Sequence, residues 1–153
     1  MAEELAVGVA EVLAERTAER PTEVELSQIP GGASRETWLA EAGDRRYVLR
    51  RDPPGSESLV AIGDEFALIG AAAEAGVPVP EPLAFEPDGG RFETAGVLMA
   101  EVEGTSVAPR ILRKPEYGTA RQRLPGQLAE ALARIHAIEP ASLDGALPAP
   151  GSD

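Results

Sequence analysis

Three short stretches with alternating apolar and polar residues follow one another between positions 22 and 51, and they constrain the fold more than any other feature. The first is "TEVELSQI", the second is "ETWLAEAG" and the third is "RRYVLRR". Alternation of period two predicts half-buried strands. Gly43-Asp44, between the second and the third, is a tight-turn signal. We therefore expect a three-stranded antiparallel meander.

Segments with helical spacing flank this meander. The N-terminal segment, residues 2 to 18, spaces its apolar residues as one face of a helix does; they are Leu5, Val9, Val12 and Leu13. Residues 62–75, "IGDEFALIGAAAEA", predict a second helix that Gly76 ends. Two further strands follow, "EPLAFEP" and "AGVLMAEVEG", and the apolar run of the second is typical of the middle of a sheet. This order predicts an α+β fold.

The sequence changes character after Gly104. Residues 105–123, "TSVAPRILRKPEYGTARQR", are basic and predict an irregular segment. The next stretch, "LPGQLAEALARIHAI", predicts a helix with one apolar face, and "EPASLDGALPAPGSD" has no periodic pattern. We therefore expect two parts, residues 1–103 and residues 104–153.

Composition argues against several classes of protein. The 153 residues include 26 acidic and 14 basic side chains, and a net charge of −12 disfavours nucleic acid as a partner. The absence of Cys and the single His exclude disulfides and leave too few ligands for a zinc site. No apolar run reaches the about 18 residues of a membrane span, and the first residues do not resemble a signal peptide. We expect a cytoplasmic protein with no membrane partner and no metal ligands of its own.

Five stretches, in this order and spacing, resemble the aminoglycoside phosphotransferase family, especially its broad "phosphotransferase enzyme family" members. They are "GGASRETW", "YVLRRDPPG", "EFALIGAAAEAGVPVPEPL", "LMAEVEG" and "LAEALARIHAIEP". The resemblance implies a protein-kinase-like small lobe with its N-terminal helix for residues 1–103, namely a five-stranded antiparallel sheet with one inserted helix. Residues 104–153 would then form the hinge, a linker and the first helix of a large helical lobe.

The same resemblance implies an ATP site. Gly31, Gly32 and Ser34 would form the turn that covers the phosphates, because glycine lets backbone N–H groups approach oxygen atoms closely. Arg50 would bind a phosphate where many kinases use Lys, and Glu65 on the following helix would hold it in place. Taken alone, a Gly-Gly turn and a helical Glu are ordinary surface features, so these roles depend on the resemblance.

The adenine end of the site is implied in the same way. Val48 lies two residues before Arg50, hence on the same face of the strand, and would pack against the ring. Met99 would line the back of the pocket. Glu101 and Val102, in the hinge, would present main-chain groups to the base.

The other conspicuous residues have simpler interpretations. Arg45 and Arg51 are predicted to be solvated strand positions that balance an acidic surface. His136 lies next to the apolar face of its helix and is predicted to be a packing residue.

Catalytic residues are not expected within this chain. The family's catalytic loop, His-Gly-Asp followed by Asn, and its metal-binding Asp come after the "LARIHAIEP" helix, and no Asp of residues 105–153 has that context. Mg²⁺ would be held by the remaining lobe. We therefore expect the nucleotide-binding lobe of an enzyme that transfers the ATP γ-phosphate to a hydroxyl of a small-molecule acceptor, and we expect it to be inactive alone.

Two alternatives stay open. The chain could be a non-catalytic binding or interaction module, or a subunit completed by another chain. The apolar face of the helix at about 125–138 is exposed if the large lobe is absent, and the helix could then fold back on the small lobe or pair with its copy in a homodimer.

Overall fold

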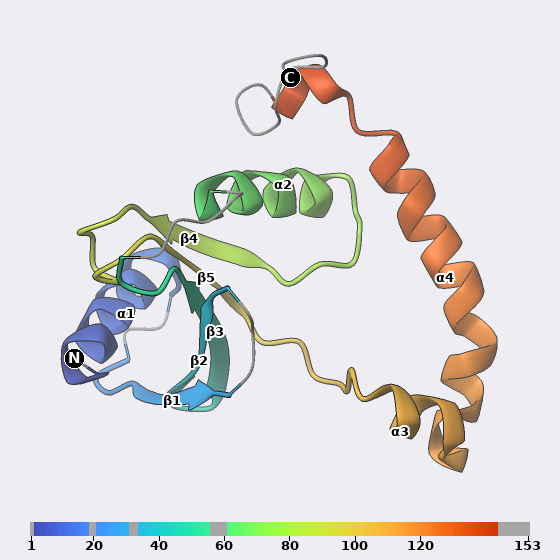
Figure 1. The fold of residues 1–153 in the computed structure, drawn as a ribbon, viewed down its shortest axis with the longest axis horizontal. Helices are drawn as coiled ribbons and strands as arrows, with labels where there is room; N and C mark the ends of the chain where they lie inside the picture. Colours follow the sequence, from blue (N-terminus) through green and yellow to red (C-terminus); the bar gives the residue numbers. More distant parts are fainter. Residues whose placement is uncertain (1, 19–20, 31–33, 56–60, 144–153) are drawn as a thin grey trace.

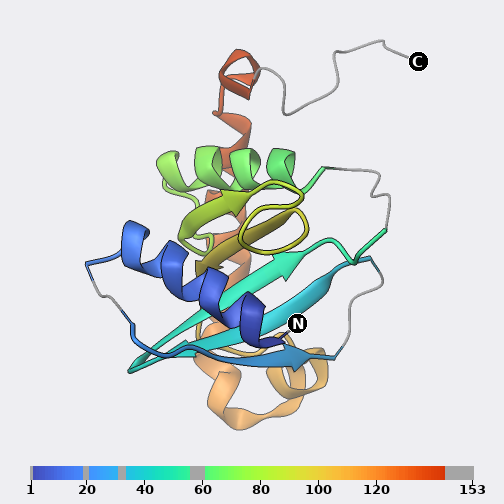
Figure 2. The ribbon, with the colours of Figure 1, turned by 90° about the vertical axis from the view of Figure 1, so that its left-hand side faces the viewer.

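The computed structural model describes residues 2–18, 21–30, 34–55 and 61–143. It contains a five-stranded antiparallel sheet in the order β1-β2-β3-β5-β4, with a helix on each side (Figures 1 and 2). The elements of this part are α1 (Ala2–Arg16), β1 (Glu25–Ile29), β2 (Glu36–Ala42), β3 (Arg45–Arg51), α2 (Ile62–Glu74), β4 (Pro82–Glu86) and β5 (Gly96–Ala100). The expected α+β fold, with one helix inserted between the third and fourth strands, is confirmed.

The β2–β3 hairpin forms where the sequence predicts it. Ala42 pairs with Arg45, so Gly43 and Asp44 are the two residues of the turn. Gly43 has φ +60°, a conformation that glycine adopts without the steric penalty of a side chain. This turn fixes the register of the whole hairpin, from Ala42 opposite Arg45 to Glu36 opposite Arg51.

Strand β5 lies inside the sheet, between β3 and the edge strand β4, and has a neighbour on each side as its apolar run predicts. Successive residues of a strand point to opposite faces. Leu49 and Leu98, which are partners across β3 and β5, therefore join α1 in one core cluster. Val48 and Met99, the next pair, join Ile62 of α2 in a second cluster on the other face. Burial of each such side chain contributes roughly 1.5–3 kcal/mol to folding.

Gly76 terminates α2 as predicted, two residues after the last helical residue, Glu74. Gly76 has φ +72°, and its N–H donates to the Ala73 carbonyl at 2.9 Å. The N–H of Val77 donates to the Ala72 carbonyl, also at 2.9 Å. These bonds satisfy carbonyl groups that have no partner within the helix, and they turn the chain toward β4.

The segment after β5 differs from the prediction. It contains α3 (Ala108–Arg113), the 3-10 turn η1 (Pro115–Tyr117), α4 (Gly118–His136) and the 3-10 turn η2 (Pro140–Leu143). The expectation of an irregular segment at 105–123 is therefore wrong. Arg121 explains part of the difference, because its Nη1 donates to the carbonyls of Ile111 at 2.7 Å and Lys114 at 2.9 Å and so ties α4 to the end of α3.

Helix α4 stands apart from the sheet along most of its length and approaches α2 only at its C-terminal end (Figure 1). There Arg134 Nη1 donates to the carbonyl oxygen of Gly76. Within the part of the chain that the structure describes, no helix is long and apolar enough to cross a membrane.

Candidate functional site

Arg50 and Glu65 lie together between β3 and α2. Arg50 shares the α2 side of the sheet with Val48 because the two are separated by one residue. Glu65 is in the first turn of α2, where its carboxylate accepts a hydrogen bond from Arg50 Nη1 on Oε1. Both side chains keep some exposure to solvent, 35% for Arg50 and 23% for Glu65. The structure thus brings together the two residues that the sequence predicts as a pair, and their role toward a phosphate stays a prediction.

A second arginine, Arg35, binds the same carboxylate and was not singled out from the sequence. Its Nη1 donates to Glu65 Oε2, and its Nε donates to Asp52 Oδ1 at 3.0 Å. The pairing register of β2 and β3 could have identified Arg35 as a neighbour of Asp52. Glu36 is opposite Arg51, so one further step along the hairpin brings Arg35 opposite Asp52.

Asp52 is itself held in place through its backbone. Its N–H donates to the Ala95 carbonyl at 2.9 Å, and its own carbonyl accepts a hydrogen bond from Thr94 Oγ1 at 2.6 Å. Asp52, Arg35, Glu65 and Arg50 consequently form one continuous line of ion pairs from the end of β3 to the first turn of α2.

Val48 and Met99 supply an apolar surface beside this line. They are partners across β3 and β5. Met99 is buried at 6% exposure with Ile62 and Val97, and Val48 is half-buried against the same cluster. The residues predicted for the two ends of a nucleotide site therefore share one face of the sheet.

The predicted hinge begins at the end of β5. The N–H of Glu101 donates to the Arg46 carbonyl at 3.1 Å, and Arg46 Nη1 lies 3.2 Å from Glu101 Oε2. Val102, the next residue, is 65% exposed. Because the Glu101 N–H is engaged within the protein, the predicted contact with a base falls to the other main-chain groups of Glu101 and Val102.

The glycine turn lies mostly outside the described residues. Gly31 and Gly32 are not among them, and Ser34 is exposed directly before Arg35. Their predicted role over the phosphates is therefore left as a prediction.

Arg51 corrects the sequence interpretation. It is 2% exposed, whereas a solvated strand position was expected. Its Nε donates to Glu36 at 2.8 Å, its Nη1 donates to Glu93 at 2.8 Å and to the Phe92 carbonyl at 3.0 Å, and its guanidinium lies 5.8 Å from the centre of the Trp38 ring. The loop between β4 and β5 covers this end of β3. Arg45, in contrast, is exposed as predicted.

His136 is also placed differently from its prediction. It is exposed at the end of α4, where a packing residue was expected. Here α4 and η2 face α2 across a mostly apolar groove of about 530 Å³. Glu65 lines one edge of the groove; its apolar lining includes Leu68, Ile69, Val79, Ile135 and Ile138.

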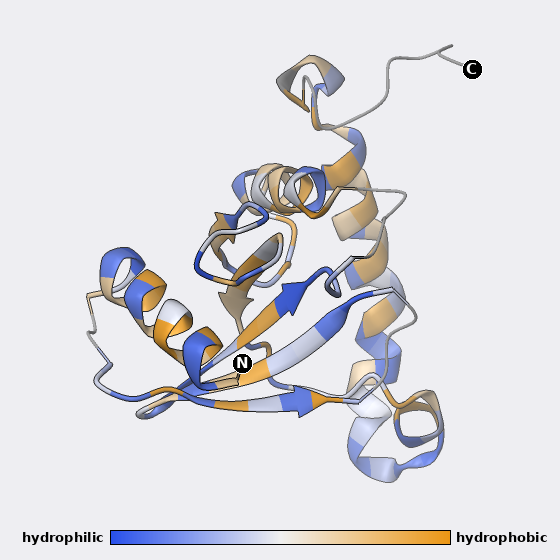
Figure 3. Cartoon of the chain, turned by 60° about the vertical axis from the view of Figure 1, so that its left-hand side comes forward, coloured by the Kyte–Doolittle hydropathy of each residue, from blue (hydrophilic) through white to orange (hydrophobic). Residues whose placement is uncertain are grey.

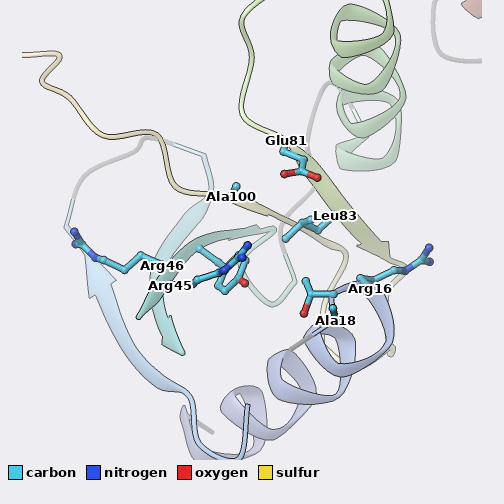
Figure 4. Close-up of a pocket in the computed structure, with 9 residues that line it drawn as sticks. Arg16, Ala18, Arg45, Arg46, Glu81, Leu83 and Ala100 are labelled. Carbon is cyan, nitrogen blue, oxygen red and sulfur yellow. The ribbon is translucent and has the colours of Figure 1, made fainter. Parts of the chain in front are cut away.

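A second hollow of about 530 Å³ has several basic residues around it, but it does not gather their charges (Figure 4). Arg16 and Arg46 extend in opposite directions away from it. Glu81 and Leu83 form part of its lining, and Glu65 and Arg50 do not. We therefore assign no phosphate site to this hollow.

Among the described residues, no group of three or more His, Cys, Asp or Glu side chains is arranged to hold a metal ion. Asp52 and Glu65, the two carboxylates in the line of ion pairs, are each bound by Arg35, which suits a line of ion pairs better than a magnesium site.

The sheet with its inserted helix and the cation on β3 paired with a helical Glu define the small lobe of a kinase-like phosphotransferase. Comparison with known proteins gives the family. Residues 25–151 match the phosphotransferase enzyme family, and the chain belongs to it.

The chain is also similar to parts of longer proteins, and its fold is similar to that of a solved structure. Human acyl-CoA dehydrogenase family member 11 is 33% identical over 129 residues, which are 82% of this chain and 16% of that protein. The probable acyl-CoA dehydrogenase IBR3 of Arabidopsis thaliana is 34% identical over 128 residues, 78% of this chain and 15% of that protein. A crystal structure from Ralstonia eutropha, described as a "putative aminoglycoside phosphotransferase", superposes with a TM-score of 0.70 at 19% identity and covers 95% of this chain and 42% of that one. The chain thus spans only a small part of these two relatives and less than half of the solved neighbour.

Proposed function

We propose that this chain is the ATP-binding lobe of a small-molecule phosphotransferase, an enzyme that transfers the γ-phosphate of ATP to a hydroxyl of its acceptor. The observation that carries the proposal is the Arg50–Glu65 pair on the α2 face of the sheet. In kinase-like enzymes a strand cation bound to a helical Glu holds the nucleotide phosphates. Family membership supports the same reading.

Arg50 suits this task chemically. A guanidinium carries five N–H donors and stays charged at every relevant pH, so it can bind Glu65 through Nη1 and still offer other donors to a phosphate. The apolar surface of Val48 and Met99 would receive the adenine ring, and the backbone of the hinge would read its edge. In this proposal residues 1–103 are the nucleotide lobe, and residues 104–153 begin the second lobe.

Magnesium would neutralise the phosphates during transfer, and the described residues hold no group of three or more His, Cys, Asp or Glu side chains arranged for a metal ion. We propose that the metal ligands and the catalytic base belong to a further helical lobe, and that the enzyme works in the cytoplasm, where ATP is available. We therefore expect the 153-residue chain, given ATP and Mg²⁺, to form ADP no faster than a control protein. ADP formation that disappears in Arg50→Ala would contradict this expectation.

A non-catalytic role is the second candidate. The exposed apolar face of α4, with Leu128, Leu132 and Ile135 each at least 45% exposed, is the feature expected of an interaction module or of a subunit completed by another chain. In the acyl-CoA dehydrogenase relatives the matching segment is about a sixth of a longer protein. Nucleotide binding distinguishes the two candidates.

The test is an ATP titration of the 153-residue chain followed by NMR chemical shifts. This chain supplies only one wall of the proposed nucleotide cleft, so it should bind ATP weakly. We expect a dissociation constant of roughly millimolar to high micromolar. Arg50→Ala should weaken binding at least about tenfold, because a charge-assisted hydrogen bond contributes about 1.5–3 kcal/mol. Arg45→Ala, an exposed arginine of the same strand, is the matched control and should bind ATP as the parent does. Equal affinity of Arg50→Ala and the parent would refute the proposed phosphate contact.

A further inference from the structure

We propose that Arg35 is a positioning residue for phosphate binding, because it fixes the orientation of Glu65 and, through Glu65, that of Arg50. This inference rests on the proposed function. It adds a residue that is not expected to touch the nucleotide but on which the affinity for phosphate groups depends.

The contacts show how Arg35 could act. The Glu65 carboxylate has two oxygens; Oε1 accepts from Arg50 and Oε2 accepts from Arg35. A carboxylate held through both oxygens by separate guanidinium groups cannot rotate freely, and its plane therefore determines where the Arg50 Nη1 lies. Ordering a long side chain such as Glu or Arg otherwise costs conformational entropy when the ligand binds. Arg35 reduces that cost for binding by ordering Glu65 before a ligand arrives.

Arg35 is itself anchored to the sheet. Its Nε donates to Asp52 Oδ1 at 3.0 Å, and the backbone of Asp52 is bound on both sides by Ala95 and Thr94. These contacts thus fix the orientation of the Glu65 side chain relative to strands β3 and β5, and not only relative to its own helix α2. Because Glu65 belongs to α2, the same contacts also fix the first turn of that helix relative to the sheet.

Solvent exposure separates the roles of the two arginines. The side chain of Arg35 is 9% exposed, and two carboxylates already engage its Nε and Nη1. The side chain of Arg50 is 35% exposed, which leaves it accessible to a ligand. Arg35 is therefore the less accessible arginine in the line of ion pairs, between Asp52 and Glu65, and Arg50 is the more accessible one.

Arg35 can also affect phosphate binding through its positive charge. The test must separate this electrostatic effect from the positioning of Glu65 and Arg50. The positive charges of Arg35 and Arg50 balance the negative charges of Asp52 and Glu65. Removal of Arg35 would leave a net negative charge beside the phosphates and repel them. Arg35→Lys retains the charge, but an ammonium group lacks the planar fork that spans two carboxylates. It therefore tests positioning without the electrostatic change.

The experiment compares the 153-residue parent with Arg35→Lys, Arg50→Ala and the double variant, using NMR titrations with ATP and, separately, with adenosine. We expect Arg35→Lys to weaken ATP binding about threefold to tenfold. In the Arg50→Ala background the same change should have no further effect, because there is no phosphate contact left to position. Adenosine binding should be unchanged. Arg45→Lys is the matched control for a conservative change of a nearby arginine.

The outcomes distinguish this inference from the proposed function. ATP affinity of Arg35→Lys equal to that of the parent overturns the inference, while loss of binding in Arg50→Ala still supports the proposed function. Arg35 has only a structural role if Arg35→Lys weakens the binding of ATP and of adenosine equally. The same conclusion follows if Arg35→Lys weakens ATP binding as much in the Arg50→Ala background as in the parent. If Arg50→Ala binds as the parent does, both proposals fail. Should Arg35→Lys not fold by circular dichroism, Asp52→Asn, which loosens the Arg35 anchor, should show the same pattern with a smaller change.

Discussion

Arg51 on β3 donates from Nη1 to the carboxylate of Glu93, 42 residues further along the chain, at 2.8 Å. Glu93 is the one non-glycine residue with positive φ, +67°, among those described. This left-handed conformation costs roughly 1–2 kcal/mol for an L-residue. The ion pair with Arg51 offsets part of that cost and attaches the loop before β5 to the sheet.

Replacement of Arg51 should therefore destabilise the fold. We expect Arg51→Ala to lower the free energy of unfolding by about 3 kcal/mol, because it leaves Glu36 and Glu93 without a common partner and opens a cavity in a buried position. Urea unfolding measures the change. Arg45→Ala, on the exposed end of the same strand, should stay within about 0.5 kcal/mol of the parent. Equal midpoints for the two variants would show that the Arg51 contacts contribute nothing to stability.

Much of the sheet could be predicted because its signal is local. The alternation in β2 and β3, the glycine turn between them and the apolar run of β5 each identify one element without knowledge of the others. The α3–α4 region has no comparable signal. Pro125 lies inside α4, where proline removes a backbone hydrogen bond and usually ends a helix. The contact of Arg121 with α3 is a tertiary interaction that periodicity does not show.

Of the candidate site, the pairing of Arg50 with Glu65 could be predicted, while the role of the pair toward a phosphate stays a prediction. The alternation of β3 places Arg50 toward α2, and the family resemblance supplies Glu65 as its partner. Alternation also places Arg51 on the opposite face, but it does not say whether another segment covers that face. The Glu36–Arg51 register could have identified Arg35 and Asp52 as neighbours. The register of these two strands, β2 and β3, could not show that Arg35 also contacts Glu65 on α2.

Gly8 should not tolerate a side chain, even though it lies in a helix. A Cβ at this position would lie 2.0 Å from the carbonyl oxygen of Arg91, which is a backbone atom and cannot move aside easily. Alanine is favoured over glycine in a helix by about 1 kcal/mol, but the clash should exceed this gain. We expect Gly8→Ala to lower the free energy of unfolding by about 1–3 kcal/mol, measured by thermal or urea unfolding.

Gly70, in α2, is the matched control for this prediction. A Cβ there would meet no atom within 4 Å. Gly70→Ala should therefore raise the free energy of unfolding by about 0.5–1 kcal/mol through helix propensity alone. If both substitutions stabilise the protein, α1 does not pack on the loop before β5 as closely as the structure shows.

Glu86 and Arg91 should make stability depend on pH in the acidic range. Arg91 donates to Glu86 Oε1 from Nη2 at 2.6 Å and from Nε at 3.0 Å, and these hydrogen bonds hold the pKa of Glu86 below its ordinary value of 4.5. A carboxyl with a lowered pKa in the folded state binds a proton more readily in the unfolded state. Its contribution is thus complete above about pH 4.5 and is lost as the pH falls through the folded-state pKa.

Glu86→Gln isolates this contribution. The parent should be more stable than the variant by about 1 kcal/mol at neutral pH, and the difference should shrink as the pH falls below about 4.5. Urea unfolding at a series of pH values measures it. Glu11→Gln, an exposed position of α1, is the control for a loss of one carboxylate. A Glu86→Gln difference that is the same at acidic and neutral pH would argue against the Arg91 contact.

The last prediction concerns the exposed face of α4, where apolar residues recur along the helix (Figure 3). Leu128, Leu132 and Ile135 are 60%, 52% and 45% exposed. Covering each would gain up to roughly 1.5–3 kcal/mol. Within the described part of the chain, α4 approaches α2 at its C-terminal end, where Ile135 lines the groove against α2. We expect the 153-residue chain to form a homodimer through this face, and a form that ends at Gly104 to be monomeric, by light scattering. Leu128→Lys with Leu132→Lys should abolish the dimer, whereas Glu130→Lys should preserve it. If the 153-residue chain stays monomeric at high concentration, the expected homodimer is refuted.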